Sequence, residues 1–217
     1  MKKTIALLFT IALSGVSLQA QLKTVHKDNP TFVGAAQAAP AALQKIFSNL
    51  GPSTSAYDST GWYLAGPDSC STPGSCYYDL LGMAFTPTAD ATVKQVRAAI
   101  QYEYSASGAN QIDFSLYSDN GGVPGTLLAG PVTVTNLPEY GTCCTLAVAS
   151  FTPVAVTGGT QYWVVANTPL TGTGSDFAGE WNMVAKIVPM AFAADGSGWW
   201  ASTANDLPAG EVLGTIP

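Results

Sequence analysis

This sequence is poor in histidine and in positive charge, with one His and eight Lys and Arg residues. Its single histidine, His26, stands near the N-terminus, so the chain beyond it has no imidazole. That absence excludes Ser-His-Asp chemistry, Cys-His chemistry and every His-containing zinc site from the rest of the chain. We therefore expect no metal site, no cofactor and no catalytic residues.

Charged residues of either sign are scarce, and basic ones are the scarcer. Asp, Glu, Lys and Arg make up 10% of the sequence, and from Ile46 onward the only basic residues are Lys94, Arg97 and Lys186. A surface with so little positive charge repels phosphate backbones and anionic lipids. We therefore expect neither nucleic acid nor a membrane surface as a partner.

Long apolar runs are also missing, with one exception at the start of the chain. The apolar stretch from Thr4 to Ser17 follows Lys2 and Lys3 and leads to Ala20. This is the layout of a secretory signal peptide, and it is too short for a retained membrane span. Residues 1–20 are thus expected to be removed, leaving no membrane span. The mature chain would be secreted, with the periplasm and the cell surface as alternatives.

The residues that are plentiful favour strands and turns. The chain has 22 Gly and 14 Pro, and 47% of its residues are apolar. With so little charge, this composition favours an all-β domain over a helical bundle. Residues 21–45 include an Ala-rich run interrupted by Pro40, and we expect them to be a flexible leader. Residues 46–217 form the predicted domain.

Period-two alternation marks the expected strands. Val96–Tyr104 alternates as one half-buried strand, and so does Gln111–Tyr117. Tyr162–Ala166 is continuously apolar, which is typical of a central strand. Further strands are expected near Trp62–Ala65, Leu80–Phe85, Val132–Thr135, Thr145–Phe151, Gly179–Val184 and Val212–Ile216. Many short strands separated by Gly-rich turns predict a two-sheet antiparallel β-sandwich with jelly-roll or Greek-key connections.

The sequence from Asp119 to Gly122, Asp-Asn-Gly-Gly, has two readings. It resembles the start of a calcium loop, but the further acidic positions and the late Glu of such a loop are missing. A tight hairpin turn, with Asn and Gly at positive φ, explains it more simply.

Several blocks resemble one family of secreted bacterial proteins. The segments Ile112–Ala129, Asn136–Leu146 and Val156–Ala166 are similar to choice-of-anchor R domains, and the likeness extends over Ile46–Ile216. The resemblance implies a secreted β-sandwich and no settled biochemical role. Family members often end in a sorting tail, which this sequence does not show before Pro217. We therefore expect free secretion or non-covalent attachment.

The four cysteines should be oxidised in an exported protein, and three pairings are open. Cys70 and Cys76 flank a turn-rich segment that brings its ends together cheaply. That leaves the adjacent Cys143 and Cys144, whose bonding needs a distorted turn because strand neighbours point to opposite faces. The resembling family often has this Cys-Cys pair without other cysteines. We predict Cys70–Cys76 and Cys143–Cys144 disulfides that stiffen loops, and the vicinal ring is also a candidate wall of a ligand site.

Aromatic residues are the candidate ligand-binding residues. Several lie in or beside Gly- and Ser-rich segments, and where two are adjacent on a strand one ring must face away from the core. Exposed rings beside polar loops suit stacking on sugars, although one ring of each pair is also suited to capping the core. The predicted ligand-binding residues are Trp62, Tyr63, Trp181, Trp199 and Trp200.

The sequence therefore predicts a non-enzymatic, extracellular protein with a binding or structural role. Carbohydrate binding is the most specific function that we predict. The expected partner is an extracellular glycan or a component of the cell envelope. The alternative is a polysaccharide-active hydrolase that uses a carboxylate pair, such as Asp176 with Glu180 or Asp113 with Glu103.

Overall fold

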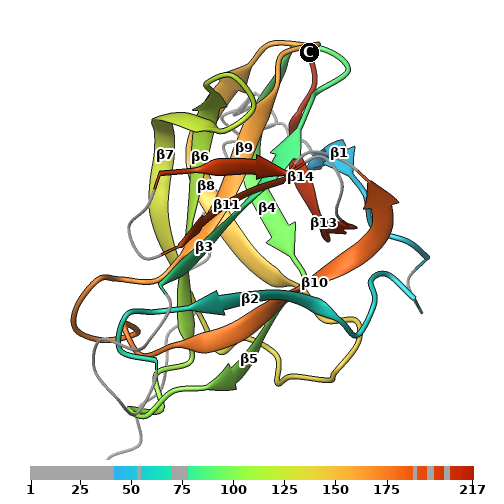
Figure 1. The fold of residues 1–217 in the computed structure, drawn as a ribbon. Helices are drawn as coiled ribbons and strands as arrows, with labels where there is room; N and C mark the ends of the chain where they lie inside the picture. The colour runs from blue at the N-terminus through green and yellow to red at the C-terminus, as the bar shows by residue number, and fades with distance from the viewer. Residues whose placement is uncertain (1–41, 53–54, 70–77, 188–189, 195–197, 203–205) are drawn as a thin grey trace, which may run out of the picture. The chain divides into compact units, whose positions relative to one another are not determined.

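The fold was obtained as a computed structural model, which describes residues 42–52, 55–69, 78–187, 190–194, 198–202 and 206–217 (Figure 1). The signal peptide, the leader up to residue 41, and Cys70 and Cys76 lie outside these ranges. The first strand, β1 (Gln44–Ser48), begins within the predicted leader, because Gln44 and Lys45 already pair with the last strand.

Four strands form the smaller sheet, in the order β1-β14-β4-β8, and every pairing is antiparallel. The neighbours are distant in sequence, as Greek-key connections produce. The strands besides β1 are β4 (Ala91–Ala98), β8 (Ala147–Val156) and β14 (Gly210–Thr215).

Ten strands form the larger sheet, whose main path is β13-β10-β2-β3-β9-β6-β7. Strand β11 pairs with β3 and β12, while β5 pairs with β10. The bounds are β2 (Gly61–Ala65), β3 (Asp79–Phe85), β5 (Ile100–Tyr104), β6 (Gln111–Asp119), β7 (Pro124–Thr135), β9 (Tyr162–Asn167), β10 (Ala178–Ile187), β11 (Met190–Ala194), β12 (Trp200–Ser202) and β13 (Asp206–Pro208).

The predicted all-β, two-sheet antiparallel sandwich is confirmed, and its core lies between the two sheets. The smaller sheet contributes Val93, Val96 and Val212, and the larger contributes Phe114 and Trp181. The rings of Phe114 and Trp181 meet edge to face, with centroids 6.3 Å apart. Each fully buried side chain of this size contributes about 1.5–3 kcal/mol, so the core is the main source of stability.

The central position predicted for Tyr162–Ala166 is also confirmed. Strand β9 lies between β3 and β6, and residues Trp163 to Ala166 are buried. Val164 and Ala166 face the core between the sheets, whereas Trp163 and Val165 pack in a second cluster with Ala84 and Ala191. Both faces of β9 are thus covered, which explains its continuous hydrophobic sequence.

The alternating stretch Val96–Tyr104 is not one strand, contrary to the prediction. Strand β4 ends at Ala98 in the smaller sheet, and β5 begins at Ile100 in the larger. The backbone N–H of Ala99 between them donates to Ala209 O at 3.0 Å. The alternation holds in β4, where Val96 and Ala98 are buried, but not in β5, where Gln101 is buried and Tyr104 is exposed.

A second crossing lies beside the first. Ala209 separates β13 in the larger sheet from β14 in the smaller one. Asn182 on β10 joins both crossings, since its N–H donates to Ala99 O at 2.9 Å and its carbonyl accepts from Ala209 N at 2.8 Å. The two sheets are therefore tied together at one corner by backbone hydrogen bonds.

The Asp119–Gly122 segment forms the predicted hairpin turn between β6 and β7. Asn120 N donates to Val123 O at 2.9 Å, and the Asp119 carboxylate accepts from Gly122 N at 3.2 Å. Positive φ was expected at Asn and Gly, but it is found only at the two glycines, Gly121 (69°) and Gly122 (93°), and not at Asn120. Two successive glycines provide this conformation at no steric cost.

Candidate functional site

An aromatic pair forms on the short hairpin of β11 and β12. Their register sets Phe192 directly opposite Trp200, and the two rings meet edge to face with centroids 6.0 Å apart. Phe192 packs against the core, whereas the Trp200 side chain is 61% exposed. The indole ring of Trp200 is thus exposed to solvent, and its contact with Phe192 holds it in place.

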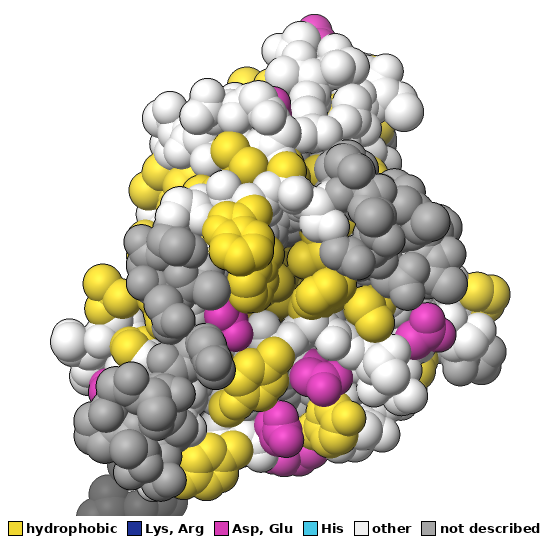
Figure 2. Space-filling view, viewed as in Figure 1, with side chains coloured by type: hydrophobic (Ala, Val, Ile, Leu, Met, Phe, Trp, Pro, Cys, Tyr) yellow, Lys and Arg dark blue, Asp and Glu magenta, His cyan; other side chains and the backbone are white. Residues whose placement is uncertain are grey.

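A pocket lies beside this pair, where β2 diverges from β3 while β11 stays paired with it. Strand β2 pairs with β3 only at Ala65–Asp79, while β11 pairs with it from Asp79 to Met83. The gap between them has a volume of about 370 Å³. Its described lining is Trp62, Met190, Phe192, Trp200, Ala201 and Ser202, here called the Trp200 pocket. Figure 2 shows hydrophobic side chains gathered over this region, with acidic ones nearby.

Two of the five predicted ligand-binding residues, Trp62 and Trp200, meet in the Trp200 pocket. Trp199 does not join them, because it packs on the other side against the cluster of Ala84, Trp163, Val165 and Ala191. The pair Trp199–Trp200 therefore divides as alternation requires, with one ring covering the sheet and one ring exposed.

Trp181 is a correction to the predicted ligand-binding residues. Its side chain is fully buried, and its indole N–H donates to Ala209 O at 2.9 Å. It lies opposite Trp62 on the neighbouring strand, and so points to the same inward face. It belongs to the core and cannot contact a ligand.

Tyr63 is exposed but faces away from the Trp200 pocket. It follows Trp62 on β2 and lies opposite Glu180 on β10. The pKa of the Tyr63 hydroxyl is raised by burial and then by the nearby Glu103 and Asp79 carboxylates. Tyr63 is therefore part of a separate acidic surface on β2, β10 and β5.

The carboxylate pairs considered for a hydrolase lie in different surroundings. The Asp176 carboxylate accepts hydrogen bonds from Ser107 N at 2.6 Å and Ser107 Oγ at 3.0 Å. Burial alone would raise its pKa, but these and further hydrogen bonds lower it. Glu180 differs, because burial and then Glu103 raise its pKa. Hence the carboxylate that influences Glu180 is Glu103, not Asp176.

Asp113 belongs to neither environment. Its carboxylate accepts a hydrogen bond from Thr133 Oγ1 at 2.6 Å across the β6–β7 pairing. Strand β6 lies between β9 and β7, while Glu103 lies on β5 beside β10. The pair Asp113–Glu103 therefore has no support in the sheet order.

An open depression of about 780 Å³ lies among three loops, which contain Asp68, Ala106–Ala109 and Gly172–Asp176. Its polar groups already bind one another: Ser175 Oγ donates to Asp68 Oδ2 at 2.7 Å, in addition to the Ser107 contacts of Asp176. Among the described residues, no group of three or more His, Cys, Asp or Glu side chains could hold a metal ion.

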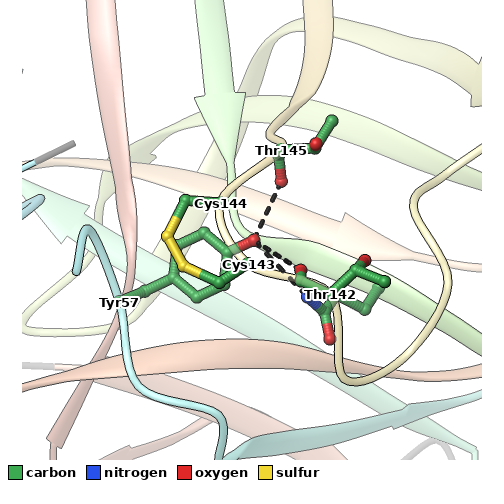
Figure 3. Close-up of a disulfide and its surroundings, with 6 residues drawn as sticks. Tyr57, Thr142, Cys143, Cys144 and Thr145 are labelled. Atoms are coloured by element: carbon green, nitrogen blue, oxygen red, sulfur yellow. Dashed lines mark hydrogen bonds between the residues drawn. A yellow bond between two sulfur atoms is a disulfide. The ribbon is translucent and has the colours of Figure 1, made fainter. Parts of the chain in front are cut away.

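A third pocket, of about 250 Å³, lies beside the cysteines between β7 and β8. The structure records a disulfide between Cys143 and Cys144 (Figure 3). The Tyr57 hydroxyl lies 3.2 Å from Thr142 O and 3.1 Å from Thr145 O, on either side of the cysteine pair. The described lining, here called the disulfide pocket, is Ser55, Tyr57, Ser59, Gln101, Gly141, Thr142 and Cys143.

The sequence did not predict several residues that line the Trp200 pocket and the disulfide pocket. Phe192 lies in a segment, Met190–Ala194, where alternation of large and small apolar residues was a usable signal for a strand. Gln101 offered no signal, because a glutamine on a strand is ordinarily solvated. Its burial depends on the β7–β8 loop, which comes forty residues later in the chain.

No protein-family model matches the chain, and no curated protein matches it. The resemblance to choice-of-anchor R domains therefore stays a prediction. No helix in the described part of the chain is long and apolar enough to cross a membrane.

Proposed function

We propose that this protein is a secreted, non-enzymatic β-sandwich that binds an extracellular glycan through the Trp200 pocket. The observation that carries the proposal is the exposed Trp200 ring, supported by Phe192 beside Trp62. A flat indole offers a large apolar surface to the C–H face of a sugar and loses little conformational entropy on binding. Rings held in place before the ligand arrives reduce the entropic cost further.

The lining of the Trp200 pocket favours binding over catalysis and a neutral glycan over a charged one. Its six described residues are aromatic, aliphatic or hydroxylated, and none carries a side chain that exchanges protons near neutral pH. General acid–base catalysis requires such a group within hydrogen-bond reach of the substrate. The nearby acidic residues would disfavour a polyanion.

The test is binding of the mature chain to a panel of neutral polysaccharides, by pull-down and then by calorimetry, together with a glycan array. Trp200→Ala should weaken binding at least about tenfold, which corresponds to 1.4 kcal/mol. Tyr104→Ala is the matched control, because Tyr104 is 53% exposed on β5 and lies outside the pocket lining. Unchanged affinity in Trp200→Ala would remove the proposal.

Export is part of this proposal and has its own test. Lys2, Lys3 and the apolar run up to Ser17 support cleavage after Ala20. Mass spectrometry of the extracellular fraction should find a mature N-terminus at or near Gln21. Recovery of intact Met1 outside the cell, or of the protein only in the cytoplasm, would contradict export.

The alternative function is a polysaccharide hydrolase on the acidic surface, not in the Trp200 pocket. The favouring observation is that Glu180, whose pKa is raised by burial and by Glu103, lies opposite the exposed Tyr63. A raised pKa favours the protonated form of a carboxyl, which is the form that a general acid needs. Release of reducing sugar that disappears in folded Glu180→Gln would establish this function instead.

A further inference from the structure

The disulfide pocket is formed by a loop that is folded back onto β5. The loop after β7 contacts β5 through backbone bonds: Tyr102 N donates to Pro138 O, and Tyr140 N donates to Tyr102 O, both at 2.8 Å. Its next residues, Gly141 to Cys144, therefore lie at a fixed place beside the larger sheet. A loop with backbone partners on a strand is restrained before any ligand binds.

Gln101 fixes this loop from below. It is only 1% exposed, its Oε1 accepts from Gly141 N at 2.8 Å, and its Nε2 donates to Thr142 O. Nε2 also donates to the Tyr57 hydroxyl at 3.4 Å, so both the oxygen and the nitrogen of the amide are bonded within the protein. Gln101 is thus a positioning residue that sets the pocket floor and leaves the rim to other groups.

The Tyr57 hydroxyl positions the segment on both sides of the cysteine pair. It lies within hydrogen-bond distance of the carbonyl groups of Thr142 and Thr145, as Figure 3 shows. Burial raises the pKa of Tyr57, partly offset by the Gln101 contact, so the hydroxyl keeps its proton. The carbonyl oxygens that precede and follow the disulfide are therefore both oriented toward Tyr57.

The disulfide ring forms one wall of the pocket. Cys144 is half-buried and packs against the core, whereas Cys143 is exposed and lines the opening. Sulfur is soft and polarizable, so this wall favours contact with C–H groups. The lining also includes Ser55 and Ser59, at exposed positions, whose hydroxyl groups suit hydrogen bonding to a ligand.

Size and charge limit the ligand of this pocket. Its volume of about 250 Å³ lies below the ~300–1,000 Å³ of sites for drug-sized molecules. None of the described lining residues has a charged side chain. A fitting ligand is small and neutral, with hydroxyl groups on one side and C–H groups on the other.

We propose that the disulfide pocket is a second binding site, separate from the Trp200 pocket, for a single neutral sugar ring. The apolar face of the ring contacts the Cys143–Cys144 disulfide, and its hydroxyl groups bond with Ser55 and Ser59. Because the disulfide is the wall, the site exists only in the oxidised protein. A dithiol reductant breaks the S–S bond to give two cysteine thiols and is itself oxidised to a disulfide.

The test is saturation-transfer NMR on the mature chain with a panel of free neutral monosaccharides. Ser59→Phe places a ring in the opening at an exposed position, so the fold is retained while the pocket is filled. Monosaccharide affinity should fall at least about tenfold in Ser59→Phe and in Cys143→Ser/Cys144→Ser, and after dithiol treatment of the wild type. Circular dichroism of each sample shows whether the strands persist.

The test of the disulfide pocket gives a different result from the test of the Trp200 pocket. Ser59→Phe should leave polysaccharide binding unchanged, and Trp200→Ala should leave monosaccharide binding at the disulfide pocket unchanged. No saturable monosaccharide signal with the wild type, or an undiminished signal in Ser59→Phe or in the double cysteine variant, would overturn the inference. Neither result depends on whether the Trp200 pocket binds a glycan.

Discussion

The indole N–H of Trp163 donates to Oδ1 of Asp119 at 2.7 Å. This contact joins the middle of the larger sheet, on β9, to the turn between β6 and β7. The same carboxylate oxygen accepts from Gln161 Nε2 at 2.7 Å. One aspartate thus satisfies a buried indole and fixes the turn, so its charge should influence the stability of the whole sandwich.

Asp119→Asn should reduce stability near neutral pH and reduce its decline in acid. Burial would raise the pKa of Asp119, but the hydrogen bonds from Trp163, Gln161 and the backbone of Gly122 and Gly121 lower it below 3.8. The folded protein therefore binds this proton less tightly than the unfolded chain does. The stabilisation is present above the ordinary pKa and is lost as the pH falls toward the lowered one.

Urea unfolding from pH 7 to pH 2 measures this effect. Asp119→Ala should cost about 1 kcal/mol at pH 7, because the Trp163 N–H loses its charged acceptor. Asp58→Asn, at an exposed carboxylate, is the control. An Asp119→Asn protein with the acid profile of the wild type would show that the contact does not affect stability.

Truncation of Trp181 should cost much more stability than truncation of Trp200. Trp181→Ala removes a fully buried side chain and should lower the free energy of unfolding by about 3–5 kcal/mol. Trp200→Ala removes only an exposed ring and its contact with Phe192, and should cost less than about 1.5 kcal/mol. Thermal unfolding of the two variants compares them directly, and equal losses would contradict the assignment of Trp200 to the surface.

Asn49→Ala should destabilise the corner where the chain crosses between the sheets. The Asn49 side chain donates to Pro208 O at 2.9 Å and accepts from Gly210 N at 2.8 Å, on either side of Ala209. Its loss leaves two buried backbone groups without partners, at a cost of about 2–4 kcal/mol.

Lys45→Ala on β1, the strand that ends just before Asn49, is the control for Asn49→Ala. The Lys45 side chain is 61% exposed and its ion pair with Glu211 spans 3.6 Å. Such a surface pair contributes at most about 1 kcal/mol. Chemical unfolding should therefore separate the two variants. An Asn49→Ala protein as stable as Lys45→Ala would refute the stabilising role of the Asn49 hydrogen bonds.

Glu180→Gln should raise the melting temperature at pH 7. Burial and Glu103 raise the pKa of Glu180 above 4.5, and its Oε2 is inaccessible and has no hydrogen-bond partner. The folded protein binds this proton more tightly, so stability decreases as the pH rises from 4.5 through the raised pKa. Glutamine removes the charge and should flatten that decrease. Glu139→Gln, at an exposed side chain, should not.

The sequence predicted the class of fold because alternation and turn residues are local signals. It located β9 through its continuous apolar residues and the β6–β7 turn through its glycines. The crossings at Ala99 and Ala209 were beyond its reach, since they depend on which strands become neighbours. The same limit applies to Trp181 and Trp200, whose neighbours in sequence give no sign that one ring is buried and the other exposed.

The pairing of β1 with β14 has a consequence for the timing of folding. Gln44 lies beside Gly214, so the first strand of the domain has no neighbour in its sheet until the last one has been synthesised. Contacts between such distant segments form slowly, and chains that wait for them expose unpaired strand edges. Strands β4 and β8 pair directly with each other, but the smaller sheet is complete only after β14 has been synthesised. Until then β1 and β4 each have an edge without its partner strand, and such unpaired edges can pair with other chains.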